Sequence, residues 1–253
     1  MKIEQFQDFL DKDLAWRKHE ISQLFMILDT VESKEVIGKS IILLLYAHWE
    51  GFVKKSSKCY LKYVSDRKIK LQELTLNFHA IVLRNHAKAC IDLNALNLSN
   101  EFAFIQKHNK MLEKQFKVKI DVDNEFDKEL IDTQHNLSSK VLKNIIEIVG
   151  VTYNDAIKTR SNYIDSNLVK HRNAIGHGNR MQGSDDLLVL EFEHIVQLKD
   201  FVVSMLDYYA DVLLSYVENE FFLQAKNQER VEYENQQELL LSRKLEEIEN
   251  RHA

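Results

Sequence analysis

The stretch KEVIGKSIILLLYAHWEGFVKKSSKCYLKYVSD, residues 34–66, decides the fold class. It is apolar almost all round from Val36 to Phe52 and strongly one-sided after that. A helix that is apolar on every side is buried by its neighbours. The pattern therefore predicts one long helix over residues 34–66 that forms the spine of the core.

The composition of the whole chain points the same way. Its 253 residues include no proline and only six glycines, whereas average usage would give about a dozen prolines. Both residues interrupt helices, and turn-rich β folds use them heavily. The sequence therefore predicts an all-α protein, a bundle of long antiparallel helices with short connections.

Apolar residues recur at helical spacing in several other segments. In residues 138–150 Ser138 or Ser139 can cap a short helix, and Gly150 can end it. In the segment from Ser161 to His177 the apolar stripe consists of Ile164, Leu168 and Ile175. The helices expected beside the central one span residues 3–31, 138–150, 161–177 and 187–224.

Two regions fall outside this regular pattern. Residues 70–135 read as a helical insertion into a domain that spans 1–225, and FKVKIDV at 116–122 alternates like a short strand. Residues 226–253 are rich in Glu, Gln, Lys and Arg. We expect this tail to be either a protruding helix that pairs with a partner or a frayed end.

Charge, cysteines and hydropathy exclude several classes of protein. The net charge of −5 means that any nucleic-acid contact must come from a local patch. Cys59 and Cys90 lack CxxC spacing and fit small buried hydrophobes better than a redox pair or a metal site. No signal peptide is apparent, and the longest apolar run, Ile41 to Trp49, is far shorter than the roughly 20 residues that span a bilayer. We expect a cytoplasmic protein without a membrane segment, metal or cofactor.

The segment HRNAIGHG, residues 171–178, concentrates groups that can carry chemistry. His177 can move a proton near neutral pH. Arg172 can hold a phosphate with two hydrogen bonds and offset the charge of a transition state. Asn173 lies four residues before His177 and shares its helix face, so it can bond the imidazole or a ribose hydroxyl. Without metal-ligand spacing, this set suits RNA cleavage, in which the ribose 2′-hydroxyl is the nucleophile.

A simpler interpretation also exists, in which cations and a glycine merely end a helix. It explains His171, Arg172 and Gly178 but neither Asn173 nor the second glycine. The catalytic interpretation has a geometric difficulty, because five residues of helix turn through about 500° and leave Arg172 and His177 roughly 140° apart. Two copies of the motif that face each other across a twofold axis would solve it, and the chemistry therefore predicts a homodimer.

Residues near the motif are candidates for a supporting role. Glu50 lies one turn after Tyr46 in a strongly apolar helix, where a carboxylate is costly unless paired. Glu50 can orient Arg172 or His177, with Tyr46 and His171 as further candidates beside them. The alternative is that Glu50 faces solvent or pairs with Lys54 at i+4.

A row of lysines follows in the same helix. Lys54, Lys55, Lys58 and Lys62 share one broad helix face. Such a basic ridge on an acidic protein can guide an RNA backbone. An ordinary solvated face is the competing interpretation.

The motif resembles a known signature. Arg172-Asn173, three further residues and His177 are similar to the Arg-x4–6-His signature of the HEPN superfamily, whose common form is Arg-Asn-x-x-x-His. The helix LLLYAHWEGFVKKSSKCYLKYV, residues 43–64, is similar to the helix before that motif in HEPN-like nucleases of prokaryotic defence and toxin–antitoxin loci. The resemblance implies an all-α homodimer and a metal-independent endoribonuclease with a composite site, in which Arg172 and His177 are catalytic and Asn173 is their neighbour. It also implies growth arrest or phage defence as the setting, with a neutralising partner protein.

Two other functions compete with this one. A non-catalytic HEPN-like module would use the same groove to bind RNA, a nucleotide or a protein. A helical scaffold would instead assemble through the tail, residues 226–253.

Overall fold

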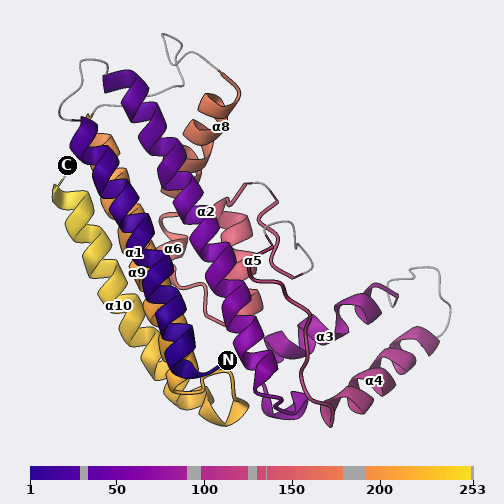
Figure 1. The fold of residues 1–253 in the computed structure, drawn as a ribbon. Helices are drawn as coiled ribbons and strands as arrows, with labels where there is room; N and C mark the ends of the chain where they lie inside the picture. Colours follow the sequence, from indigo (N-terminus) through magenta and orange to yellow (C-terminus); the bar gives the residue numbers. More distant parts are fainter. Residues whose placement is uncertain (29–33, 90–97, 125–129, 135, 179–191, 252–253) are drawn as a thin grey trace.

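The computed structural model describes residues 1–28, 34–89, 98–124, 130–134, 136–178 and 192–251 (Figure 1). This part of the chain is helical and contains no strand, which confirms the all-α prediction. In chain order its elements are α1 (Ile3–Leu28), α2 (Lys34–Asp66), η1 (Leu71–Glu73), α3 (Leu76–Ala89), α4 (Ser99–Leu112), α5 (Ser139–Val149), α6 (Asp155–Lys158), α7 (Ser161–Tyr163), η2 (Ile164–Val169), α8 (Lys170–Gly176), α9 (Phe192–Glu218), η3 (Gln224–Lys226) and α10 (Asn227–Arg251).

The core forms where α1, α2 and α9 pack along their lengths (Figure 1). Helix α2 is the spine that its sequence predicts, with Phe52, Val53 and Leu61 fully buried. Its segment Val36–Asp66 is long enough to cross a membrane, and the most apolar 18-residue window within it has a mean hydropathy of 1.3. Half of its most apolar window is buried inside the protein, as in the core helix of a bundle.

Helix α5 begins and ends at the expected residues. The Ser138 hydroxyl accepts a hydrogen bond from the Val141 N–H at 3.4 Å. Gly150 follows the last turn at φ 86°, a left-handed conformation that a glycine adopts without strain. The buried face consists of Val141, Leu142, Ile145, Ile146 and Val149. Ser138 is therefore the cap, and α5 packs one apolar side against α2 and α3.

The region 70–135 contains α3 and α4, which form an arm that projects from the lower end of the bundle (Figure 1). The strand prediction for residues 116–122 is wrong. Among the described residues the backbone pairing beside this segment is an isolated bridge between Lys70 and Gln115, next to which the Phe116 N–H donates to the Ile69 carbonyl at 2.8 Å. Phe116 is buried, and Val118 and Ile120 are partly buried. The alternation therefore reflects one-sided burial of an extended segment, not a sheet.

The charged tail neither protrudes nor frays, which corrects both expectations for it. Helix α10 packs against α9 and α6 and buries Leu241, Leu245 and Ile248. Glu234 accepts from the Thr152 N–H at 2.8 Å, and Glu249 from the Arg160 Nε at 2.7 Å. Acidic residues that look solvated in the sequence thus fasten α10 to the segment around α6.

A buried ionic cluster joins α1 to α2. The Arg17 guanidinium contacts the Asp13 carboxylate at 2.7 Å, and both side chains are less than one-tenth exposed. Arg17 also lies 3.4 Å from His48 Nδ1. Because arginine only donates, Nδ1 carries the lone pair. Burial, followed by the charge of Arg17, lowers the pKa of His48 to about 4, so the ring is neutral at pH 7.

Of the two cysteines, Cys59 lies in the described part of the chain. Cys59 is a buried free thiol whose pKa burial raises to about 12, so it is inert as a nucleophile at neutral pH. Cys90 lies outside the described residues, as do residues 179–191, which include the start of the helix expected over 187–224.

Candidate functional site

The motif occupies α8, which packs against α2 at the upper end of the bundle (Figure 1). A π-helical stretch, η2, leads directly into it. Such stretches are rare and often occur at functional sites. His171 is buried, and its Nδ1 lies 2.8 Å from the Asn167 carbonyl inside η2. Because a carbonyl only accepts, Nδ1 carries the proton, and His171 ties the start of α8 to the π-helical segment.

Arg172 is half-buried and held in place by two neighbours. Its guanidinium lies over the Tyr46 ring, 4.6 Å from the centroid, which is close enough for a cation–π contact. One of its terminal nitrogens donates to the Asn173 Oδ1 at 2.9 Å. The Asn173 oxygen therefore bonds Arg172 in this structure and not the imidazole.

Tyr46 connects Arg172 to two other parts of the chain. Its hydroxyl accepts a hydrogen bond from the Leu137 N–H at 2.7 Å. Burial raises the pKa of Tyr46 well above its usual value, and the charge of Glu50 raises it further. A hydrogen bond with Glu50 acts in the same direction, while Arg172 and the Leu137 N–H oppose it. Glu50 thus contacts Tyr46, through which it can influence Arg172.

His177 caps the C-terminus of α8 and is exposed to solvent. Its N–H donates to the Asn173 carbonyl at 3.0 Å, so the helical twist continues up to His177. Gly178 follows at φ 71°. In the described part of the chain no side chain hydrogen-bonds the imidazole of His177. One chain therefore presents Arg172 against Tyr46 of α2 and leaves His177 exposed to solvent at the end of α8.

The lysine row is less available than the sequence suggests. Lys58 is buried and donates to the Asn124 carbonyl at 2.9 Å, so its assignment to an exposed RNA-binding face is wrong. Lys55 lies 3.7 Å from Asp13. Lys62 lies 3.4 Å from Asp66, and Lys54 is half-buried. The long lysine stems allow this arrangement, since they pass along apolar surface to reach polar partners.

Two contacts that support the motif have no signal in the sequence. One is the Leu137 N–H on Tyr46, a main-chain group 91 residues away. The other is Asp165 in η2, which accepts from the Ser139 N–H at 2.8 Å and from its hydroxyl at 2.6 Å. Both attach the N-terminal end of α5 to the motif. Main-chain donors and π-helical turns leave no residue pattern that would reveal them.

Tyr46→Phe tests the link between the ring and the main chain. The substitution keeps the ring under Arg172 but leaves the buried Leu137 N–H without an acceptor. We expect a loss of about 1–3 kcal/mol in the free energy of unfolding, the cost of an unsatisfied buried donor. Urea denaturation would measure this loss. The matched control is Tyr153→Phe, which removes a hydroxyl contact with Ser161 at 2.9 Å. An equal loss in both variants would contradict a special role for the Leu137 contact.

No three His, Cys, Asp or Glu side chains gather as a metal-binding group in the described ranges. A protein-family model described as HEPN_MAE_28990-like HEPN matches residues 6–222, a span that includes Tyr46, Glu50 and all of α8. None of the curated proteins and none of the solved structures compared with the chain gives a match.

Proposed function

We propose that this chain, which belongs to the HEPN_MAE_28990 family of HEPN-like domains, is a metal-independent endoribonuclease that acts as a homodimer. Family membership by itself suggests a nuclease or an RNA-binding module. The observation that supports catalysis, beyond RNA binding, is the arrangement of two side chains at α8. Arg172 is oriented by Tyr46 and Asn173, while His177 stays exposed at the end of the same helix.

The chemistry needs only these groups and the RNA. The ribose 2′-hydroxyl attacks the adjacent phosphorus, and the bond to the 5′-oxygen of the next nucleotide breaks. The products are a 2′,3′-cyclic phosphate and a 5′-hydroxyl. His177 serves one of the two proton transfers, as base toward the 2′-hydroxyl or as acid toward the leaving oxygen, and solvent serves the other. Arg172 holds the phosphate and offsets the charge that develops on it.

The placement of the two side chains supports the proposed homodimer. Arg172 faces α2, and the helical twist leaves His177 roughly 140° away. A second chain related by a twofold axis would bring its own His177 to the Arg172 of the first. The working pair would then consist of Arg172 from one chain and His177 from the other.

In the cell such an enzyme would arrest growth or act in phage defence, and a partner protein would hold it in check. This setting rests on the resemblance of α2 and α8 to HEPN-like nucleases of defence and toxin–antitoxin loci. It would show as growth arrest on induction of the wild-type chain and normal growth on induction of His177→Ala.

The proposal is tested with purified protein and RNA in excess EDTA. We expect cleavage that leaves a 2′,3′-cyclic phosphate, and no cleavage at a position where a single 2′-deoxynucleotide replaces the ribonucleotide. Cleavage at the 2′-deoxy position would exclude the 2′-hydroxyl as nucleophile. Activity that survives in both Arg172→Ala and His177→Ala would exclude the motif as the active site. RNA binding without any cleavage would favour the non-catalytic module.

A further inference from the structure

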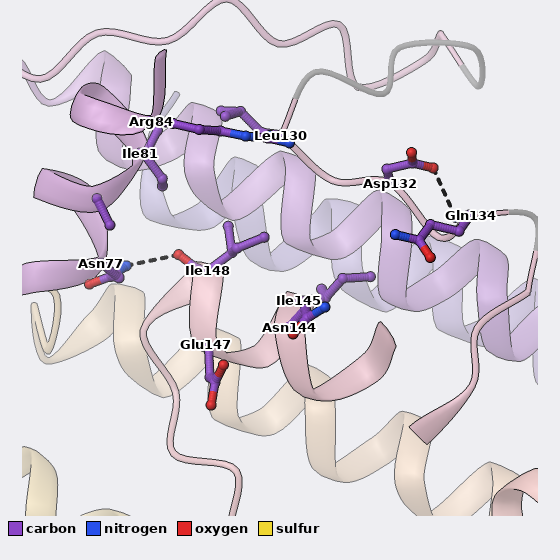
Figure 2. A pocket seen from close by; sticks show the side chains of 11 residues that line it. Asn77, Ile81, Arg84, Leu130, Asp132, Gln134, Asn144, Ile145, Glu147 and Ile148 are labelled. Atoms are coloured by element: carbon purple, nitrogen blue, oxygen red, sulfur yellow. Dashed lines mark hydrogen bonds between the residues drawn. The ribbon is translucent and has the colours of Figure 1, made fainter. Parts of the chain in front are cut away.

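A pair of histidines joins α3 to α4, the two helices of the arm (Figure 1). Figure 2 shows Asn77 of α3 directed toward α5, where its amide donates to the Ile148 carbonyl at 2.9 Å. Two residues of helix turn through about 200°, so His79 points away from α5. It meets His108 of α4, and the His79 Nδ1 lies 3.0 Å from the His108 Nε2. The two histidines are 29 residues apart in the sequence, a spacing that is not typical of a metal-binding motif.

The surroundings of His79 fix the orientation of its ring. The residue is 7% exposed, and its Nε2 lies 3.2 Å from the Leu74 carbonyl. Because a carbonyl only accepts, Nε2 carries the hydrogen, and the neutral ring has a lone pair on Nδ1. That lone pair points at His108. A histidine that binds a metal almost always donates its second ring N–H in this way, to a carbonyl or carboxylate that sets the tautomer and the direction of the ring.

The separation of the two nitrogens fits a shared metal ion. Zinc–histidine bonds of about 2.0–2.1 Å at a tetrahedral angle place two ligand nitrogens about 3.3 Å apart. The observed distance of 3.0 Å is shorter by about 0.3 Å. His108 is half-buried, so its ring can move by this amount and water can reach the ion to complete its coordination. On binding, the hydrogen on Nε2 of His108 moves to Nδ1 of the same ring, which frees the second lone pair without net loss of a proton.

We propose that His79 and His108 form a site between α3 and α4 for a divalent ion that prefers imidazole, namely Zn²⁺, Ni²⁺ or Cu²⁺. Mg²⁺ and Ca²⁺ prefer oxygen ligands and are excluded by the same chemistry. With two protein ligands and water in the other positions, the ion would be bound reversibly, unlike a structural zinc with four protein ligands. Helix α4 contains no buried residue, so the ion would link α4 to α3 where burial contributes little. The arm and α8 lie at opposite ends of the bundle (Figure 1), which places this ion away from the proposed RNA cleavage.

Calorimetry with Zn²⁺ and Ni²⁺ tests the proposal, with Mg²⁺ as the control ion. The full chain is used without a histidine tag, after EDTA has removed any metal and dialysis has removed the EDTA. His108→Ala is the main variant, because a half-buried position tolerates the change, and His79→Ala removes the other ligand. His194→Ala, at an exposed position on α9, is the matched control for the loss of a histidine elsewhere. Thermal unfolding without metal would verify that each variant folds.

We expect Zn²⁺ to bind the wild type at least about tenfold more tightly than His108→Ala or His79→Ala, and equally tightly to His194→Ala. Zn²⁺ should also raise the melting temperature of the wild type but not of His108→Ala, because an ion that binds the folded state stabilises it. Zinc affinity that is equal in the wild type and His108→Ala would overturn the proposal and assign the ion to other histidines. So would a wild type that binds neither Zn²⁺ nor Ni²⁺. Because RNA cleavage is measured in EDTA, the outcome here is independent of the ribonuclease proposal.

Discussion

His177→Ala and Arg172→Ala are each expected to lower RNA cleavage by roughly 100- to 10,000-fold, the usual contribution of a positioned proton-transfer group or of a charge that stabilises the transition state. His177 is exposed, and no side chain of the described chain hydrogen-bonds its ring. Its replacement should therefore change the free energy of unfolding by no more than about 0.5 kcal/mol. Single-turnover cleavage in EDTA, measured alongside urea denaturation, separates loss of chemistry from loss of fold.

Matched controls are available on the same chain. His19 is exposed on α1 and Arg243 is exposed on α10, so His19→Ala and Arg243→Ala remove the same chemical groups elsewhere. Both should cleave RNA at the wild-type rate. If His19→Ala were as defective as His177→Ala, the loss would reflect a general change of charge or RNA binding and not catalysis at the motif.

Heterodimers decide whether the site is shared between chains. A dimer with Arg172→Ala in one subunit and His177→Ala in the other retains one working pair if each pair spans both chains. Two purification tags allow its isolation, and about half of the wild-type activity is expected. The reciprocal dimer, with both substitutions in one subunit and none in the other, should then be inactive. A site within each chain predicts the opposite result for the two dimers, which would exclude the composite arrangement.

The fold was predictable where the sequence of one segment is enough to show that its helix is buried. Residues 34–66 are apolar on every side at their start, so any all-α arrangement must surround them, and α2 is the spine. The ends of α5 were equally predictable, because Ser138 and Gly150 cap the helix through contacts with backbone groups of the same segment. The wrong predictions concern segments whose structure depends on contacts with residues far away in the sequence. Residues 116–122 alternate as predicted but pair with no second strand in the described part of the chain. The acidic residues of α10 accept hydrogen bonds from groups around α6.

The candidate site divides in the same way. The sequence shows which chemical groups are present at 172–177, and the resemblance indicates how they could act. It could not show that Asn173 bonds Arg172 or that the Tyr46 ring lies beneath that guanidinium. These contacts depend on how α8 packs against α2 after the π-helical stretch η2. Lys58 shows most clearly what the sequence could not reveal. It lies in a row of lysines, yet it is buried and donates a hydrogen bond to the Asn124 carbonyl.

The second large effect is on stability, and it concerns the ionic cluster between α1 and α2. Asp13→Ala is expected to lower the free energy of unfolding by about 3–5 kcal/mol, because it leaves a buried guanidinium without its counter-charge. Arg17 cannot easily escape to solvent. Its guanidinium packs so closely on Gly51 that a Cβ there would lie 2.9 Å from a terminal nitrogen. It also contacts the ring and the carbonyl of His48, both at 3.4 Å, and the Trp16 ring, 4.7 Å from its centroid, and none of these groups carries a negative charge.

The same helix supplies a matched control at the surface. Lys12 and Asp8 form a pair with the same four-residue spacing and the same 2.7 Å distance, but their side chains are 75% and 60% exposed. Asp8→Ala should therefore cost no more than about 1 kcal/mol. Urea denaturation of the two variants would measure the contrast between a buried and an exposed ion pair. A third variant, Asp13→Ala with Arg17→Met, removes both charges and should recover much of the loss, since apolar residues can replace a buried ion pair at little cost. If the double variant were as unstable as Asp13→Ala, the loss would come from the other contacts of Asp13, with the Trp16 indole N–H at 3.3 Å and with Lys55 at 3.7 Å, and not from the unpaired charge of Arg17.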